Sequence, residues 1–279
     1  MSVLTEAECA QYRDVGYVAG KRLLTDAEAA QYRVDAERCC GPQKKVGDRR
    51  QASNRLKPYL LFPWAGQLVR HPKILDAVEQ LIGPDILVFH TTVWLKEPMS
   101  GSFVPWHQDA TYFGLAPFEH VTAWVALTPS TRENGCVEVL PGSHTTGQRP
   151  HKDQRDERAM LSRGQTLTDA IDDSGGVRLE MQPGDVSFHH TLLMHRSAPN
   201  QTQDRRIGIG FSYIPTHVRH TGPTRLSATL VRGEDRHRNF DPEPIPAGEG
   251  DAAAVEAHYQ ALSRFWVASE GIPEMAHAH

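Results

Sequence analysis

From residue 85 onwards, the chain is divided into short segments rich in β-branched and aromatic residues, with Gly, Pro, Asn or Ser between them. Their length and composition are typical of strands, and no regular helical pattern lies between them. At least seven such strands predict an antiparallel sandwich or barrel, so the fold class is mainly β with flanking helices. The expected strands are 86–95, 103–107, 121–127, 136–140, 177–181, 186–190 and 206–214.

Helices are expected on both sides of this core. Thr5 and Thr25 are each followed three residues later by a glutamate, which is the capping-box pattern of a helix start. The other expected elements are a short strand at 16–24, a loop at 40–54, a helix at about 70–82 and a closing helix at 251–270. We therefore expect a single domain over residues 1–279, with helical support in 1–84 and the β core in 85–240.

One segment of the core, residues 144–174, does not fit the strand pattern. It is polar and charged, and at about 30 residues it is too long for an idle connection in a compact domain. We expect an insertion there that lies near a functional site and acts as a lid.

The charge balance and the cysteine content exclude several classes of protein. The 30 basic and 34 acidic residues give a net charge of −4, which argues against nucleic acid or an anionic membrane as the main partner. No apolar run approaches the roughly 20 residues that span a bilayer, and the N-terminus has no signal-peptide pattern. Four cysteines indicate a reducing compartment. A cytoplasmic protein is expected, with no prediction of its oligomeric state.

The strongest chemical signal is the pair His107 and Asp109. They are two residues apart at the end of an expected strand, where alternate side chains share a face. An imidazole and a carboxylate side by side are two of the three ligands in the two-histidine, one-carboxylate set that binds non-haem iron(II). The third ligand is then expected to be a histidine from a distant strand.

Three histidines compete for that third position: His189, His190 and His195. His195 is favoured because it ends an apolar run, precedes a Ser-Ala-Pro-Asn turn and lies eleven residues before Arg206. That distance suits a strand, a turn and an adjacent strand.

The strand that begins at Arg206 is expected to form one wall of a cavity. Arg206, Gly208, Gly210 and Ser212 share one face, and large apolar residues share the other. A guanidinium group above small residues suits bidentate capture of a carboxylate. Alone, such an arginine is usually a surface ion pair, and a lone histidine is usually a core or surface residue. The combination of these histidines, the carboxylate and the arginine on a β-rich chain indicates a functional site.

Together, His107-Gln-Asp109, the Asn134-Gly-Cys and Leu140-Pro-Gly-Ser-His144 segments, His195 and Arg206 resemble the phytanoyl-CoA dioxygenase family. The resemblance covers roughly residues 85–215. It implies a double-stranded β-helix, which is the jelly-roll core of cupin-like proteins. It also implies a dioxygenase that uses Fe(II), 2-oxoglutarate and O2, hydroxylates an unactivated C–H bond, and releases succinate and CO2.

Carried over position by position, the resemblance implies that His107, Asp109 and His195 bind the iron and form the catalytic centre. Halogenating relatives have a small residue at the position of Asp109, so oxygen insertion is expected here. The resemblance further implies that Arg206 binds the far carboxylate of 2-oxoglutarate. The other implied cosubstrate contacts are Ser197, Trp124, Thr92 and Lys57.

The expected substrate is a small polar metabolite, such as an aminophosphonate or an amino-acid derivative, because basic residues follow the Arg206 strand and occur in 144–174. One alternative is a tailoring oxygenase for a bulkier natural product, with an aromatic wall that includes Trp94 and Phe113. A second alternative is a non-catalytic, metal-binding, cupin-like ligand sensor. The candidate substrate contacts are Trp106, Tyr112, His217 and Arg219.

Overall fold

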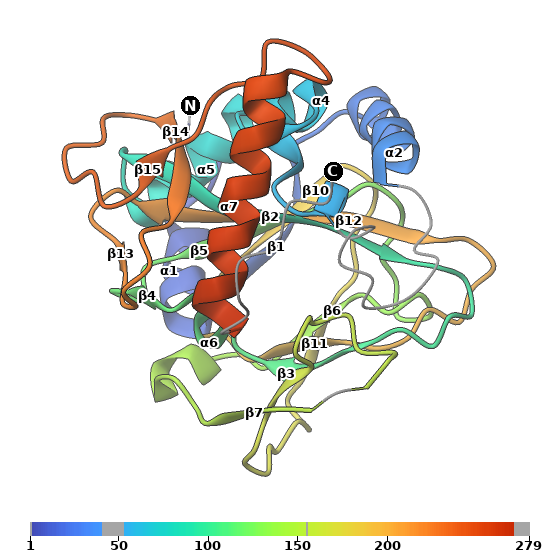
Figure 1. The fold of residues 1–279 in the computed structure, drawn as a ribbon. Helices are drawn as coiled ribbons and strands as arrows, with labels where there is room; N and C mark the ends of the chain where they lie inside the picture. The colour runs from blue at the N-terminus through green and yellow to red at the C-terminus, as the bar shows by residue number, and fades with distance from the viewer. Residues whose placement is uncertain (1, 41–52, 155, 271–279) are drawn as a thin grey trace.

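The computed structural model describes residues 2–40, 53–154 and 156–270. Two sheets form its centre, and the larger one lies between a layer of helices and the smaller sheet (Figure 1). The larger sheet has the strand order β1-β10-β5-β12-β2-β14-β15, and the smaller has the order β3-β11-β6-β9. Every pairing is antiparallel except that of β14 with β15. The jelly-roll prediction is confirmed.

The strands of the larger sheet are β1 (Tyr17–Arg22), β10 (Asp185–His190), β5 (Val121–Ala126), β12 (Arg206–Pro215), β2 (Ile86–Lys96), β14 (Ser227–Arg232) and β15 (Asp241–Pro242). Those of the smaller sheet are β3 (Val104–His107), β11 (His195–Ser197), β6 (Val137–Val139) and β9 (Val177–Leu179). Two short hairpins pair β4 (Leu115–Ala116) with β13 (Arg219–His220), and β7 (His151–Asp153) with β8 (Gln165–Leu167). All seven strands expected after residue 85 are present.

The helices are α1 (Glu6–Val15), α2 (Asp26–Cys40), α4 (Pro63–Leu68), α5 (Pro72–Ile82), α6 (Ala110–Phe113) and α7 (Ala252–Glu270). Short 3-10 turns occupy Ser53–Arg55, Pro58–Leu60 and Ser143–Thr146. Both capping boxes form: the Thr5 and Thr25 hydroxyl oxygens each accept from the backbone N–H three residues later, at 3.2 Å. No helix in the described ranges is long and apolar enough to cross a membrane. Residues 41–52 of the expected loop lie outside the described residues.

The two faces of β12 show how the sequence positions the site. Ile207, Ile209, Phe211 and Tyr213 belong to the main apolar core, together with side chains from α4 and α5. On the other face, Arg206, Gly210 and Ser212 line a cavity together with residues of the smaller sheet. Because side chains alternate along a strand, one face of β12 packs in the core and the other lines a candidate site.

The 144–174 insertion and α7 both contribute residues to the lining of a second, outer cavity. The insertion contains the β7–β8 hairpin, and its lining residues lie between Asp156 and Gln165. Helix α7 crosses in front of the larger sheet (Figure 1) and contributes Trp266 to the same lining. Its Phe265 packs against Phe89 and Phe113, with ring centroids 6.0 and 6.2 Å away.

Candidate active site

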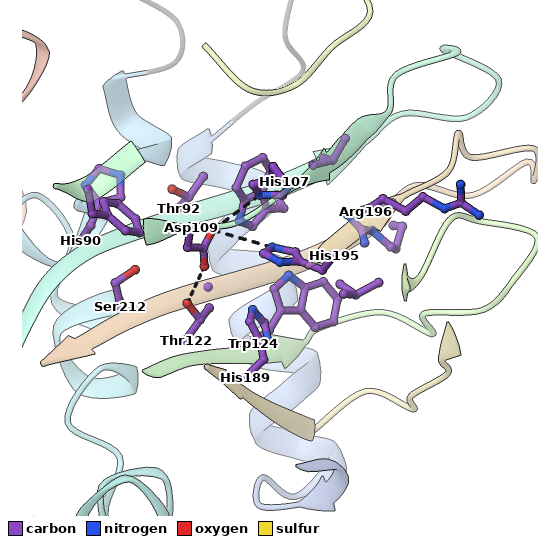
Figure 2. A pocket seen from close by; sticks show the side chains of 17 residues that line it. His90, Thr92, His107, Asp109, Thr122, Trp124, His189, His195, Arg196 and Ser212 are labelled. Carbon is purple, nitrogen blue, oxygen red and sulfur yellow. Dashed lines mark hydrogen bonds and ion pairs between the residues drawn. The ribbon is translucent and has the colours of Figure 1, made fainter. Parts of the chain in front are cut away.

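Three side chains converge where the smaller sheet faces the larger one. His107 ends β3, His195 begins β11, and these two residues are direct partners in the antiparallel pairing of the strands. One ligand atom from each of His107, Asp109 and His195 lies within 4.8 Å of the other two. Asp109 Oδ1 is 3.5 Å from His107 Nε2 and 3.7 Å from His195 Nε2 (Figure 2).

The turn after β3 brings Asp109 to this position. The strand ends at His107, and Asp109 has helical backbone angles (φ −58°, ψ −34°) as it precedes α6. His107 and Asp109 do lie side by side, but strand alternation, from which this was predicted, is the wrong reason for it. Gln108 does point elsewhere, because its side-chain amide donates to the carbonyls of Gly147 (3.0 Å) and Leu192 (2.7 Å).

Backbone carbonyls fix the orientation of both imidazoles. His107 Nδ1 is 2.9 Å from the Pro105 carbonyl oxygen, and His195 Nδ1 is 2.9 Å from that of Leu193. A carbonyl oxygen only accepts, so each Nδ1 carries the hydrogen and each Nε2 presents a lone pair. Burial, with His107 nearby, lowers the pKa of His195 to about 4, so this ring is neutral, as a metal ligand must be.

The carboxylate of Asp109 is ionised and oriented. Burial alone would raise its pKa, but His195 and His107 in their protonated forms outweigh burial and hold that pKa well below the usual value, so the carboxylate loses its proton before the rings lose theirs. Thr122 Oγ1, from β5, donates to Asp109 Oδ2 at 2.8 Å. Oδ1 therefore points toward the two imidazoles. Two neutral nitrogens and one carboxylate oxygen on one side of a point fit Fe(II).

A buried cation, Arg206, belongs to the lining of the inner cavity, which is the cavity that β12 shares with the three candidate ligands. Arg206 is 2% exposed, and burial lowers its pKa to about 10. Its Nη1 donates to the Gly135 carbonyl (3.1 Å), but its Nε has no hydrogen-bond partner, and no carboxylate of the described residues forms an ion pair with it. A buried guanidinium without a counter-ion is costly unless an anion binds there. Arg206 therefore fits one carboxylate of 2-oxoglutarate.

The remaining residues of the inner cavity include three of the implied cosubstrate contacts. The Trp124 ring centroid is 5.1 Å from the Arg206 guanidinium carbon, a cation–π arrangement. The Ser197 hydroxyl donates to the Gly135 carbonyl at 2.6 Å. Thr92 pairs with Gly210 across the β2–β12 ladder. All three line the cavity with the metal ligands.

Lys57 is the implied cosubstrate contact that the structure places elsewhere. Its ammonium group forms a fully buried ion pair with Glu243, so its charge is already balanced within the protein. It is not part of the lining of either cavity. The structure thus gives no support to the expected contact between Lys57 and the cosubstrate.

Three of the four candidate substrate contacts also lie outside both cavities. Trp106 lies against Arg196, whose guanidinium carbon is 4.7 Å from the ring centroid. His217 pairs with Glu119 at 2.9 Å near the surface. Arg219 is exposed on β13. Of the four, only Tyr112 lines the outer cavity.

The outer cavity has a volume of about 450 Å³ and is continuous with the inner one, because His90, Thr92, Trp94, His107 and Asp109 line both. Its aromatic lining consists of Trp94, Tyr112, Phe113 and Trp266. The insertion also contributes to this lining, and its Ser162 hydroxyl donates to the Tyr112 hydroxyl at 3.2 Å.

Several residues of the site were not found from the sequence: Thr122, His90 and Trp266. Thr122 and Trp266 have no local motif. His90 lies on β2, its ring stacked 4.7 Å from that of Phe265, and its Nδ1 has no partner in the described part of the chain. His189 lines the inner cavity but is not within the ligand group, which leaves His195 as the third member.

Comparison with known proteins gives consistent matches. Residues 12–208 match the family model described as phytanoyl-CoA dioxygenase. Human peroxisomal phytanoyl-CoA dioxygenase is 38% identical over 142 residues, which are 50% of this chain and 42% of that protein. The 1-deoxypentalenic acid 11-beta-hydroxylase of Streptomyces arenae is 30% identical over 195 residues, 67% of this chain and 63% of that protein. The matched region thus spans less than two thirds of either relative.

A solved structure extends the similarity to nearly the whole chain. The non-heme monooxygenase ThoJ, in its apo form, is 34% identical and superimposes with a TM-score of 0.84. The superposition covers 94% of this chain and 97% of that one.

Proposed function

Because this chain belongs to the phytanoyl-CoA dioxygenase family of Fe(II)- and 2-oxoglutarate-dependent oxygenases, we propose that it hydroxylates a C–H bond of a metabolite large enough to fill the outer cavity. The observation that carries this proposal is the position of that cavity. His107 and Asp109 belong to its lining, so a substrate bound there would lie beside the metal. Fe(II), bound with 2-oxoglutarate, would supply the activation of O2 that this reaction needs.

The size and lining of the cavity support the bulkier of the two substrate classes. A volume of about 450 Å³ falls within the range of roughly 300–1,000 Å³ that is usual for sites of drug-sized ligands. Its aromatic side chains suit an apolar ring or chain. Of the basic residues that favoured a small anionic substrate, His217 and Arg219 lie elsewhere, and the arginines of the lining are Arg55 and Arg163. The Streptomyces relative, named for hydroxylating 1-deoxypentalenic acid, is consistent with this class.

The protein's own side chains would bind the metal and the cosubstrate, orient them, and exclude water from the site. His107, Asp109 and His195 would hold the metal on one side, which leaves its other side to the cosubstrate and O2. Arg206 would bind one end of 2-oxoglutarate, with Trp124 beside it. Trp94 and Phe113 lie at the junction of the two cavities and would keep water from the reacting centre. This reaction needs no general acid or base from the protein.

A screen for succinate release tests the proposal. The Fe(II)-loaded protein, with 2-oxoglutarate and O2, would be offered two sets of compounds: small aminophosphonates and amino-acid derivatives, and larger metabolites with apolar rings or chains. We expect stimulated succinate formation and a product heavier by one oxygen atom in the second set. Stimulation by the small set alone would overturn the proposed substrate class.

Two variants sharpen this screen. Asp109→Ala removes a metal ligand and should abolish succinate formation, while its thermal unfolding without metal stays near that of the parent. Met160→Trp, which adds bulk to the outer cavity, should lower turnover of a large substrate more than that of a small one. Tight zinc binding, with no succinate from any compound, would instead favour the non-catalytic sensor.

A further inference from the structure

Two buried lysines of this chain differ in how their charge is balanced. Lys57 pairs with Glu243, and both side chains are 2% exposed. Lys96 is 0% exposed and forms no ion pair with any carboxylate in the described ranges. A buried ammonium group without a counter-ion needs an explanation, because desolvation penalises the charge.

Three oxygen atoms surround the Lys96 nitrogen. It donates to the Ser197 carbonyl (3.0 Å), the Ser197 hydroxyl (2.6 Å) and the Ala198 carbonyl. These three acceptors match the three N–H bonds of an ammonium group. Since β11 begins at His195, Lys96 ties the end of the strand that carries a proposed metal ligand to β2.

The strand register places this nitrogen next to the proposed cosubstrate carboxylate site. Lys96 on β2 is the direct partner of Arg206 on β12, so both side chains point to the same face of the sheet. Burial and the Arg206 guanidinium lower the pKa of Lys96 to about 6. A carboxylate bound at Arg206 would oppose this shift and favour the charged amine.

The Gly135 carbonyl connects the two groups. It accepts from both the Ser197 hydroxyl (2.6 Å) and Arg206 Nη1 (3.1 Å). A side chain at Gly135 would come within 1.9 Å of the Ala198 carbonyl oxygen, so only glycine allows this close approach. The Ser197 hydroxyl and Arg206 Nη1 therefore donate to one carbonyl oxygen, with which a bound carboxylate would compete for both donors, and Lys96 fixes the position of the Ser197 oxygen.

We propose that Lys96 is a positioning residue for the dicarboxylate cosubstrate: it holds Ser197 beside Arg206 and, once the far carboxylate binds there, adds a second buried positive charge next to it. This inference rests on the proposed assignment of that carboxylate to Arg206. Because its three N–H bonds are occupied, Lys96 acts through Ser197 and through its charge rather than by direct contact.

Two 2-oxo acids distinguish this role from a merely structural one. 2-Oxoglutarate has the far carboxylate, and 2-oxobutyrate lacks it, while both have the same metal-binding end. Each would be titrated into the Fe(II)-loaded protein without oxygen, and the visible charge-transfer absorption gives its Kd. For Lys96→Met, we expect at least a tenfold weaker Kd for 2-oxoglutarate, with 2-oxobutyrate changed less than twofold. The affinity for Fe(II) should also stay unchanged.

Other outcomes overturn the proposal. If both acids weaken by the same factor, Lys96 only supports the strand that carries His195. If neither weakens, Lys96 has no role in binding. Arg206→Met tests the premise separately. If Arg206→Met selectively weakens the binding of 2-oxoglutarate and Lys96→Met does not, only the inference about Lys96 is overturned. If Arg206→Met shows no selective weakening, the assignment of the carboxylate to Arg206 is overturned as well.

Ser197→Ala keeps the inference testable if Lys96→Met does not fold. It removes the hydroxyl that Lys96 holds and leaves the lysine in place. The same selective weakening of 2-oxoglutarate is expected, and its absence overturns the proposal. Lys57→Met is the matched control, since it removes the other buried lysine and should leave the ratio of the two affinities unchanged.

Discussion

The Thr122 hydroxyl donates a 2.8 Å hydrogen bond to Asp109 Oδ2, while Asp109 Oδ1 lies toward His107 and His195. Thr122 belongs to β5 of the larger sheet, whereas both histidines belong to strands of the smaller sheet. The orientation of the carboxylate thus depends on one sheet and that of the imidazoles on the other. The metal centre should therefore be sensitive to how the two sheets pack.

Thr122→Val tests this dependence, because valine has nearly the same shape and lacks the hydroxyl. Loss of a hydrogen bond to a metal ligand typically weakens metal binding by about 10–100-fold. We expect a decrease of this size in Fe(II) affinity, measured anaerobically by competition with a chelator. Thr122→Ser keeps the hydroxyl and should bind Fe(II) nearly as well as the parent. Equal affinity in the valine variant would show that the turn alone orients Asp109.

Gly208 and Gly210 offer a matched pair for the cosubstrate pocket. A Cβ at Gly208 would lie 1.9 Å from Trp124 Cζ2, so the indole that packs against Arg206 must move. At Gly210 the nearest atom is Trp94 Nε1 at 3.3 Å, which needs only a small adjustment. We expect Gly208→Ala to weaken 2-oxoglutarate binding more than tenfold, and Gly210→Ala only a few-fold, in the anaerobic titration. Similar effects in the two variants would contradict the role given to Trp124.

The core of this fold could be predicted from the sequence because strand alternation is a local property. Ile207 and Phe211 alternate with Gly208 and Gly210 along β12, and this pattern alone identifies which face is packed and which is open. The ligand group was predicted from the spacing of His107 and Asp109 and from the sequence around His195, and the family resemblance implied the same three residues. Asp109 shows the limit: a turn, and not the strand, brings it beside His107.

The residues that the sequence did not reveal depend on pairings between distant segments. Lys57 looked like a free cation, but its partner Glu243 lies 186 residues away. Thr122 and Lys96 are ordinary strand residues until the register of β5, β2 and β12 places them beside Asp109 and Arg206. No local pattern encodes such contacts.

Acid should destabilise the metal-free protein steeply. Burial lowers the pKa to about 3 in His90 and His189, and to about 4 in His120, His190 and His195. In the unfolded chain these groups titrate near pH 6.5, so between pH 6.5 and 4 the unfolded state binds more protons. The free energy of unfolding therefore falls as the pH falls, by about 1.4 kcal/mol per pH unit for each proton taken up.

Urea unfolding of the metal-free protein at several pH values measures this uptake. We expect more than one proton to be bound on unfolding near pH 5.5, and the number to decrease by about one in His190→Asn. That residue packs near Tyr12 and His144, outside the inner cavity, so the variant leaves the ligand group intact. A slope of one proton or less would mean that these rings are not held neutral.

Lys57→Met should affect stability and not cosubstrate binding. The ammonium group and Glu243 form a buried pair, and Glu243 also accepts from the hydroxyls of Tyr59 and Thr229, both at 2.8 Å. Removing one partner of a buried pair typically costs about 3–5 kcal/mol, because the other charge is left uncompensated. We expect a loss of this size in urea unfolding, and a smaller loss when Glu243→Gln is added. The Kd for 2-oxoglutarate should match that of the parent in both variants, since Lys57 lies outside both cavities. Weaker binding of the cosubstrate without loss of stability would restore Lys57 to the site.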